Sequence, residues 1–378
     1  MSTNSPAQKP KIALFTTVEG HTSIAEAAKQ ALADHYDVVT FFDRDELMNL
    51  YVFIYQNFPG TFKIPFEISQ NQSIMRYTQG QLLRKYRARI HRFISQHRPE
   101  LLISTYALFN PAIEAAAQAS NLPFINIVTD PWTFHPLFIS RAAEKNIVFD
   151  DRAVHRSEEF ESGENTTAMG WFVRQEFSGS YQVVKVREEL QLDPKMLTLV
   201  IATGSEGTNS ILTILPALLK TAQPVQVVIA CGNNRRLFKV VKATQRILRT
   251  LKSPNKFIPI PFTHEIHKYF QAADLVIGKA GPNTIFEVVA TQTPFLAITH
   301  VAGQEDGNLQ LIAEYGLGMV EENPFAVGKL LQQIIENPAQ LTAFKKSITK
   351  MADYNATAPK NLRQEVARLL ASKKTHQK

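Results

Sequence analysis

The feature that most constrains the fold is a series of continuous apolar runs separated by segments with helical spacing of apolar residues. In the first half of the chain the runs are KIALFTT, YDVVTFFD, ELLIST, PFINIVT and KNIVFD, with helical patterns such as SIAEAAKQALADH and NPAIEAAAQASN between them. Strands that are apolar on both faces and alternate with helices form a parallel sheet covered on both sides. This alternation therefore predicts that the first half of the chain forms an α/β domain of the Rossmann type.

The same alternation begins again in the second half. The runs LTLVIAT, VQVVIACG, KFIPIP, DLVIGKA and PFLAIT follow a break at about residues 175–195. A chain of 378 residues, of which 44% are hydrophobic, is long enough for two such domains. We predict an N-terminal domain over 11–175, a C-terminal domain over 195–350 and a C-terminal helix with a basic tail over 351–378. Fold analogy suggests that this helix crosses back to the first domain.

Composition narrows the cellular location. The single cysteine, Cys231, excludes an intrachain disulfide, and the polar start MSTNSPAQKPK has no apolar core of a signal peptide. No run approaches the roughly 18 apolar residues that span a bilayer. We expect a cytoplasmic protein, either soluble or peripheral on the inner face of the membrane. The net charge of +7 does not by itself choose between nucleic acid, anionic lipid and phosphorylated substrates.

A Gly-Pro-Asn-Thr turn joins the run DLVIGKA to a helical pattern that we expect to begin at about Thr284. A helix N-terminus after Gly281 directs amide groups toward an anion, and Thr284 adds a hydroxyl. Glu287 falls one turn further on, where its carboxylate can accept hydrogen bonds from both hydroxyls of a ribose. The pattern indicates a nucleotide site. The alternative is a capped turn in which Glu287 only interacts favourably with the helix dipole.

The loop HVAGQEDGNLQ follows the next strand pattern and is expected at the same edge of the sheet. Its Gln304, Glu305 and Asn308 are side chains suited to sugar hydroxyls, which both donate and accept hydrogen bonds. An ordinary polar surface loop is the alternative.

These segments resemble the donor-binding signature of glycosyltransferase family 28, through GKAGPNTIFEVVATQTPFLAI followed by GQEDGN. That family includes monogalactosyldiacylglycerol synthases, processive diacylglycerol glucosyltransferases and the transferase that makes peptidoglycan lipid II. The branch that glycosylates diacylglycerol fits best. Further segments resemble this branch in order: HRPELLIST, IVTDPWTFHP, GWFVRQEF, ATGSEGTN and CGNNRRL.

The resemblance implies a GT-B fold, in which two Rossmann-like domains face each other across a cleft. It implies an acceptor site in the first domain and a UDP-sugar, UDP-glucose or UDP-galactose, in the second, with inverting transfer and neither cofactor nor bound metal. The donor residues implied by position are Gly204, Ser205, Glu206 and Gly207 near the phosphates, Phe262 and Ile266 around the uracil, Lys279, Gly281, Asn283 and Thr284 at the diphosphate, Glu287 at the ribose, and Gln304, Glu305 and Asn308 at the sugar.

The expected acceptor is a lipid hydroxyl of the diacylglycerol type. The segments TTVEGH and STYALFNP depart from the family's usual Gly-rich loop and Ser-Val-His-Pro. Two alternatives therefore stay open: a transferase with a non-glycerolipid acceptor, and a catalytically silent GT-B module that binds nucleotide sugar.

His21 follows the first strand, where a parallel α/β domain presents its ligand crevice. Its imidazole can take the proton from an acceptor hydroxyl that attacks the anomeric carbon. Asp130 and His135 in TDPWTFHP are the rival bases. The alternatives are a structural or capping histidine, and a turn-forming aspartate before Pro131.

The segment 76–98 carries seven Lys/Arg and no acid, and it follows the aromatic-rich LMNLYVFIYQNFPGTFKIPFEISQ. Aromatic side chains beside a basic helix suit an anionic membrane surface, and Arg84, Lys85, Arg87 and Arg89 are the candidate contacts. RNA uses the same residue types, but the sequence has none of the RNA-binding signatures, so we expect no nucleic acid. A helical hairpin that covers the sheet is the remaining alternative.

Overall fold

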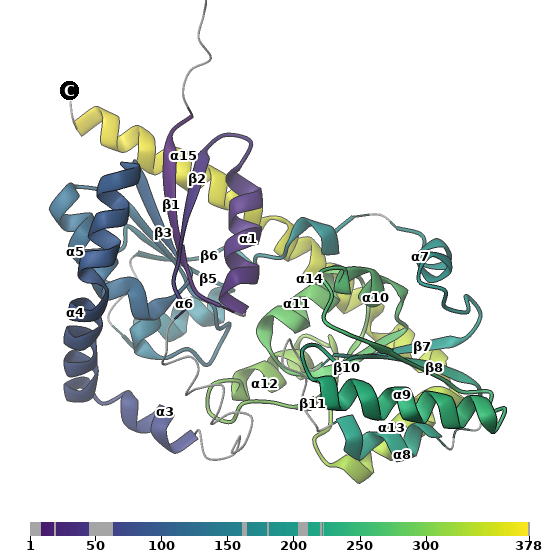
Figure 1. Ribbon diagram of the computed structural model, residues 1–378. Helices are drawn as coiled ribbons and strands as arrows, with labels where there is room; N and C mark the ends of the chain where they lie inside the picture. Colours follow the sequence, from purple (N-terminus) through teal and green to yellow (C-terminus); the bar gives the residue numbers. More distant parts are fainter. Residues whose placement is uncertain are drawn as a thin grey trace, which may run out of the picture. The chain divides into compact units, whose positions relative to one another are not determined.

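The computed structural model describes residues 9–18, 20–44, 63–160, 165–179, 181–202, 211–219, 221 and 223–376. These residues form two compact α/β units (Figure 1). The first unit ends at Arg174 and takes up the chain again from Asn355, whereas the second runs from Gln175 to Tyr354. The C-terminal helix therefore belongs to the same unit as the N-terminal strand.

The first unit is built on a six-stranded sheet in which every pair of neighbouring strands is parallel, in the order β2-β1-β3-β4-β5-β6. All side chains of β3 and β4 are buried, as expected for strands covered on both faces. The strands are β1 (Lys11–Thr16), β2 (Asp37–Phe42), β3 (Leu101–Ser104), β4 (Phe124–Ile127), β5 (Lys145–Val148) and β6 (Thr166–Ala168).

The helices of the first unit cover both faces of this sheet. They are α1 (Gly20–Leu32), α3 (Lys63–Ser69), α4 (Gln72–His97), α5 (Asn110–Ser120), α6 (Asp151–Glu158) and α15 (Ala358–His376). Helix α4 buries Leu82, Tyr86, Ile90 and Ile94, which recur every four residues on one face. Helix α15 packs on α1, and Arg363 donates a hydrogen bond to the carbonyl of Ala31 at 3.2 Å.

The second unit repeats the design with another six-stranded parallel sheet, in the order β12-β11-β10-β7-β8-β9. Gly278 allows β10 to approach β7 closely, because a Cβ there would lie 2.1 Å from the carbonyl oxygen of Ala202. The strands are β7 (Leu197–Ala202), β8 (Val225–Ala230), β9 (Lys256–Ile260), β10 (Leu275–Lys279), β11 (Phe295–Thr299) and β12 (Gly318–Val320).

The helices of the second unit are α7 (Val183–Glu189), α8 (Ile211–Leu219), α9 (Arg235–Thr250), α10 (Ile266–Ala272), α11 (Pro282–Ala290), α12 (Asp306–Glu314), α13 (Pro324–Glu336) and α14 (Lys345–Ala356). Of these, α8 to α12 lie between successive strands of the sheet, α7 precedes β7, and α13 and α14 follow β12. The apolar faces of α8, α9 and α13 meet the sheet in one large cluster, to which β7, β8, α8 and α13 contribute most of the side chains.

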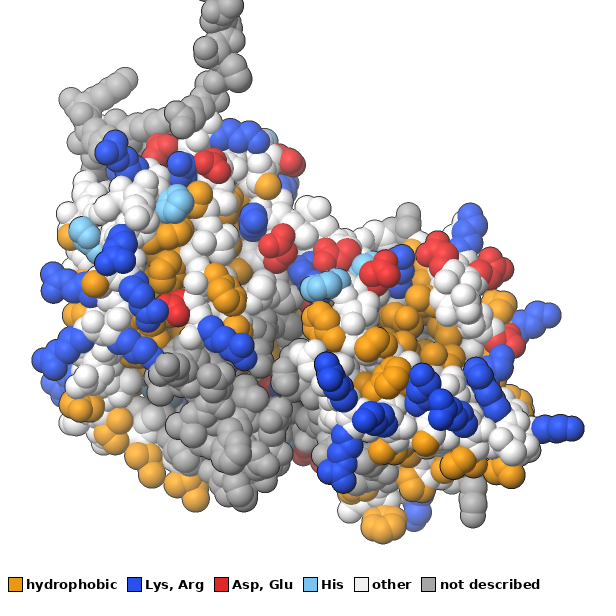
Figure 2. Space-filling model, in the orientation of Figure 1, with side chains coloured by type: hydrophobic (Ala, Val, Ile, Leu, Met, Phe, Trp, Pro, Cys, Tyr) orange, Lys and Arg blue, Asp and Glu red, His pale blue; other side chains and the backbone are white. Residues whose placement is uncertain are grey.

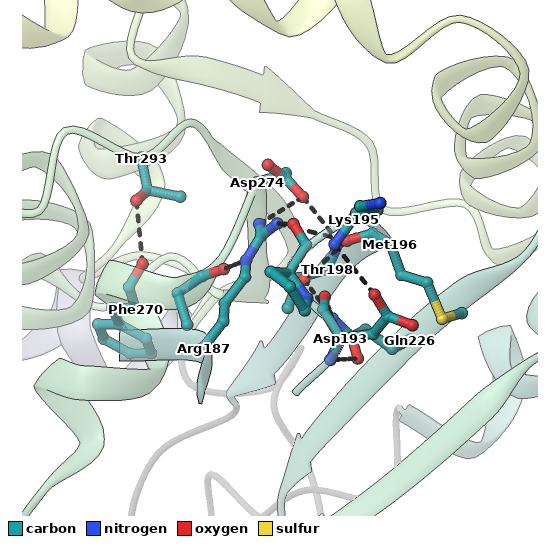
Figure 3. Close-up of polar contacts among 11 residues, drawn as sticks. Arg187, Asp193, Lys195, Met196, Thr198, Gln226, Phe270, Asp274 and Thr293 are labelled. Carbon is teal, nitrogen blue, oxygen red and sulfur yellow. Dashed lines mark hydrogen bonds and ion pairs between the residues drawn. The ribbon is translucent and has the colours of Figure 1, made fainter. Parts of the chain in front are cut away.

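A buried arginine ties α7 to the amino-terminal edge of this sheet (Figure 3). The guanidinium of Arg187 donates hydrogen bonds to the carbonyl of Ala272 and to the carboxylate of Asp274, each at 2.8 Å. The same carboxylate accepts a hydrogen bond from the amide of Thr198 at 2.7 Å. A cavity of about 470 Å³ lies here, lined by Arg187, Asp274 and neighbouring residues. None of the described donor residues expected from the sequence lines it, because they lie at or after the ends of β9, β10 and β11, at the opposite edge.

Candidate active site

Two loops meet at the carboxyl edge of the second sheet. Strands β10 and β11 are parallel neighbours, so the loop that leads from β10 into α11 and the loop that leads from β11 into α12 lie side by side. Asn308, in the first turn of α12, donates to the carbonyl of Ala280 at 2.8 Å and joins the two loops. The structure therefore brings together the two segments that the sequence assigned to the donor.

Helix α11 begins at Pro282, two residues before the start at Thr284 that the sequence predicted. The prediction was wrong because proline at the first helical position has the required φ and has no amide hydrogen to leave unpaired. Gly281 is the N-cap, and no side chain caps it. Asn283 and Thr284 consequently lie in the first turn and Glu287 in the second. The first amides of α11 are thus placed as in helix N-termini that bind anions.

The ammonium of Lys279 lies beside this helix start. A Cβ built on Gly281 would be 3.1 Å from Lys279 Nζ, so glycine leaves room for the cation there. Lys279 forms an ion pair with Oε1 of Glu305, and Oε2 of Glu305 accepts the amide of Val301 at 2.7 Å. The carboxylate of Glu305 is almost fully buried, so in this structure it holds Lys279 in place. A fixed cation next to a helix N-terminus is an arrangement that binds phosphate.

A buried acceptor is left without a partner in the same loop. Asn308 is buried, and no donor from the described part of the chain reaches its Oδ1. Buried polar atoms normally have a hydrogen-bond partner, so an unpaired amide oxygen is consistent with a ligand hydroxyl as its donor.

Of the remaining donor residues, those that the structure describes lie at the same edge of the sheet. Phe262 follows β9 and is 47% exposed, and the partly buried Ile266 begins α10. Gln304 is half-buried in the loop after β11, and Glu287 is half-buried on α11. Gly204, Ser205, Glu206 and Gly207 lie outside the described residues.

The candidate base lies in the first unit, where α1 begins after β1. His21 Nδ1 is 2.8 Å from the carbonyl oxygen of Thr105, and its ring packs edge-on against Tyr106 with centroids 4.9 Å apart. A carbonyl only accepts hydrogen bonds, so Nδ1 carries the proton and Nε2 keeps its lone pair. Burial lowers the pKa of His21 to about 4, which keeps the ring neutral at physiological pH. This neutral tautomer can accept a proton.

Thr105 is itself held firmly against β1. Its amide donates to the carbonyl of Phe15 at 3.0 Å, and its hydroxyl donates to Thr16 Oγ1 at 3.0 Å. The sequence interpretation missed Thr105 as the partner that orients His21. The available signal was its place directly after the strand run ELLIS, but the neighbouring position of β1 and β3 was needed to connect it with His21.

The rival bases follow β4 at the same edge of the first sheet, and both are buried. His135 uses both ring nitrogens: Nδ1 accepts the amide of Leu137, and Nε2 lies 3.1 Å from Ser69 Oγ. Burial lowers the pKa of His135 to about 4. These contacts are those of a structural histidine. The loop that carries Asp130 is anchored by Trp132, which donates to Asp150 at 2.9 Å.

The two Rossmann-like units have the GT-B fold, as predicted. Acinetobacter baumannii MurG, whose crystal structure is 18% identical, superposes with a TM-score of 0.63 and covers 94% of this chain and 99% of its own. TcCGT1 in complex with UDP gives a TM-score of 0.64 at 14% identity, covering 97% of this chain and all of that one.

Sequence comparison gives the family. Residues 198–366 match the glycosyltransferase family 28 C-terminal domain, and residues 19–167 match the model of monogalactosyldiacylglycerol (MGDG) synthase. Together the two matches confirm the resemblance to glycosyltransferase family 28, and the chain is a glycosyltransferase.

The relatives come from bacteria and plants. The processive diacylglycerol beta-glucosyltransferase of Bacillus licheniformis is 24% identical over 264 residues, which is 70% of this chain and 67% of that protein. Monogalactosyldiacylglycerol synthase 2 of Arabidopsis thaliana is 23% identical over 354 residues, which is 85% of this chain and 72% of that protein.

Proposed function

We propose that the protein transfers a hexose from a UDP-sugar to the hydroxyl of a diacylglycerol-type lipid at the inner face of the membrane, with inversion at the anomeric carbon. The observation that carries the proposal is the ammonium of Lys279 beside the N-terminus of α11, with Glu287 one turn further along. The relatives named for diacylglycerol glycosylation support the lipid acceptor, and neither a non-glycerolipid acceptor nor a silent binding module is favoured by them.

The second unit holds the donor in this proposal. The diphosphate binds at the start of α11 and is neutralised by Lys279 and the helix amides, with Asn283 and Thr284 beside it. The sugar hydroxyls bind Gln304 and the unpaired Oδ1 of Asn308, and Glu305 acts here mainly through its ion pair with Lys279. The expected roles of the other donor residues are unchanged: Gly281 and Gly204–Gly207 at the phosphates, and Phe262 and Ile266 at the uracil.

The first unit supplies the base. His21 Nε2 takes the proton of the acceptor hydroxyl while that oxygen attacks the anomeric carbon from the side opposite the leaving UDP. The hydrogen bond from Nδ1 to Thr105 orients the ring and stabilises the imidazolium that forms. Charge on the departing diphosphate is met by Lys279 and α11, so the proposal requires neither a metal nor a cofactor.

The function is tested by incubating the protein with UDP-glucose or UDP-galactose and detergent-dispersed diacylglycerol. We expect UDP release together with a glycolipid product of inverted configuration, and the donor that supports it identifies the hexose. Hydrolysis without a glycolipid product, or no turnover with either donor, would contradict the proposal.

The donor site predicts a specific effect of Glu287→Ala. Removal of a charged acceptor costs about 1.5–3 kcal/mol, so the affinity for UDP should fall roughly 10- to 100-fold. Calorimetry with UDP measures this loss. Glu314→Ala, on the next helix of the same unit, is the control and should leave the affinity unchanged. Unaltered binding in a folded Glu287→Ala protein would refute the ribose role.

Helix α4 carries the proposed membrane contacts of the first unit. Arg84, Lys85, Arg87 and Arg89 are all exposed, although Arg89 forms an ion pair with Asp43. Exposed apolar side chains lie close to them in sequence: Ile64 and Ile68 on α3 and Ile74 and Tyr77 at the start of α4. Figure 2 shows hydrophobic side chains along the lower left, where Figure 1 places α3. In the part of the chain that the structure describes, no helix is long and apolar enough to cross a membrane.

We expect this surface to prefer anionic vesicles over neutral ones, with the preference falling as salt rises. Reversal of Arg84, Lys85, Arg87 and Arg89 to glutamate should lower binding to anionic vesicles by roughly 1000-fold, since each of the four surface cations contributes about 1 kcal/mol. Co-sedimentation of the purified protein with each vesicle type measures the effect. If the wild-type protein sediments equally with anionic and with neutral vesicles, the basic segment 76–98 is a solvated helix face.

A further inference from the structure

Helix α9 in the second unit is basic on its exposed side to an unusual degree. The segment 235–252 contains seven Lys/Arg and no Asp or Glu. Lys239, Lys242, Arg246 and Arg249 are spaced by three or four residues and are all exposed, so they form one stripe along the helix. Figure 2 shows the row of Lys and Arg side chains over α9.

The cations of α9 have no ion-pair partner among the residues that the structure describes. The cations of α4 are different, because Arg89 pairs with Asp43. An ordinary protein surface mixes both signs of charge, so a stripe without counterions is complementary to an extended anionic partner.

A row of exposed aliphatic side chains runs along another side of α9 and its C-cap. Val240, Ile247 and Leu251 are 39%, 58% and 71% exposed, and separations of seven and eleven residues place them on one side of the helix. The buried side is held by Leu237, Val241 and Leu248, so the aliphatic row is not needed for packing on the sheet. Helix α9 therefore has three faces: one apolar and buried, one basic, and one aliphatic and open.

We propose that the basic stripe and aliphatic row of α9, together the α9 surface, form a second membrane-binding surface that lies on an anionic lipid bilayer. Cations beside exposed aliphatic side chains match the boundary between phosphate headgroups and acyl chains. A nucleic acid would use the cations but would leave Ile247 and Leu251 without a role. The inference rests on the proposed action on a membrane lipid and adds a contact in the unit that holds the donor.

The test is a position-specific fluorescence titration of the full-length protein with vesicles. Burial raises the pKa of the Cys231 thiol to about 11, so this single cysteine should not react with a maleimide dye. Ala243→Cys places an environment-sensitive nitrobenzoxadiazole dye on α9, and Ala343→Cys places it on the 3-10 helix Pro338–Phe344 of the same unit. Both alanines are exposed. Arg84→Glu and Arg87→Glu are present throughout, so that α4 does not hold the protein on the vesicle.

With phosphatidylglycerol-containing vesicles at low salt, the dye on α9 should shift to the blue and brighten, and the dye at position 343 should not. Lys239→Glu, Lys242→Glu and Arg246→Glu together should weaken the titration by roughly 100-fold, since each surface cation is worth about a 5-fold change in binding. The matched control changes Lys345, Lys346 and Lys350 of α14 to glutamate and should leave the titration nearly intact. Ile247→Ser with Leu251→Ser should weaken it by roughly 10-fold through lost apolar burial.

Three outcomes would overturn the proposal. The first is that the dye on α9 does not respond to vesicles. The second is that the dyes at positions 243 and 343 respond equally. The third is that single-stranded RNA gives the α9 dye the same response as vesicles, and that Ile247→Ser with Leu251→Ser does not reduce it. Turnover of the α9 variants with detergent-dispersed diacylglycerol is measured in parallel. It should match that of wild type, so a protein that fails as a transferase is distinguished from one whose α9 does not bind membranes.

Discussion

His21→Ala should lower turnover by roughly 10²- to 10⁴-fold, the usual contribution of a positioned general base. The affinity for UDP should stay nearly unchanged, because His21 lies in the first unit and the expected donor residues lie in the second. Steady-state kinetics for turnover and calorimetry for UDP separate the two effects. Because burial lowers the pKa of His21 to about 4, we also expect the base form to persist through weakly acidic pH and to be lost only near pH 4.

Two control variants separate His21 from its rivals. His135→Asn should retain most of the turnover, since the ring nitrogens of His135 are already used by Leu137 and Ser69. Asp130→Asn tests the remaining candidate. If Asp130→Asn alone removes turnover, the base is Asp130 and His21 only positions the acceptor. Full turnover in the His21→Ala protein would end the proposal for His21.

The second large effect is a loss of stability on mild acidification. Burial lowers the pKa of His135 from 6.5 to about 4 in the folded protein. Between these values the unfolded chain binds more protons than the folded chain, so the free energy of unfolding falls as the pH falls through this window. From pH 7 to pH 5 the loss through His135 should be about 2 kcal/mol. His21, which is partly exposed, should add a smaller loss of the same sign.

Urea unfolding at pH 7 and at pH 5 measures this dependence. In His135→Asn the difference between the two pH values should shrink by about 2 kcal/mol, whatever the absolute stability of the variant. An asparagine oxygen can still accept the amide of Leu137, so the local turn is retained. The control is His91→Asn, which changes an exposed histidine on α4 and should keep the pH dependence of the parent. An unchanged difference in His135→Asn would refute the assignment.

The parallel sheets could be predicted from the sequence because short continuous apolar runs that alternate with helical patterns are typical of strands buried on both faces. The run DLVIGKA illustrates this: it forms β10, and its single glycine lies where the carbonyl of Ala202 leaves no space for a Cβ. The exact helix start was predicted less well. Periodicity locates the apolar face of α11 from Ile285 onward, whereas the first turn depends on the local geometry of Gly281 and Pro282.

The exposed and basic character of a helix could likewise be predicted only in part. The charges of α4 and α9 are visible in the sequence, but both helices also carry aliphatic residues that a pattern assigns to the core. Packing decides that Leu237 and Val241 face the sheet and that Ile247 and Leu251 do not. For α4, packing also decides that Arg89 meets Asp43.

By itself the sequence determined the two α/β series and the residues that follow their strands, because local periodicity and turn chemistry act over a few neighbouring positions. Only the tertiary structure decided which of those residues touch. His21 is oriented by Thr105, 84 residues away, since β3 lies next to β1 in the sheet. Lys279 is fixed by Glu305, 26 residues away, since β10 and β11 are neighbours. Strand order sets both contacts, and a periodic pattern of apolar residues does not encode strand order.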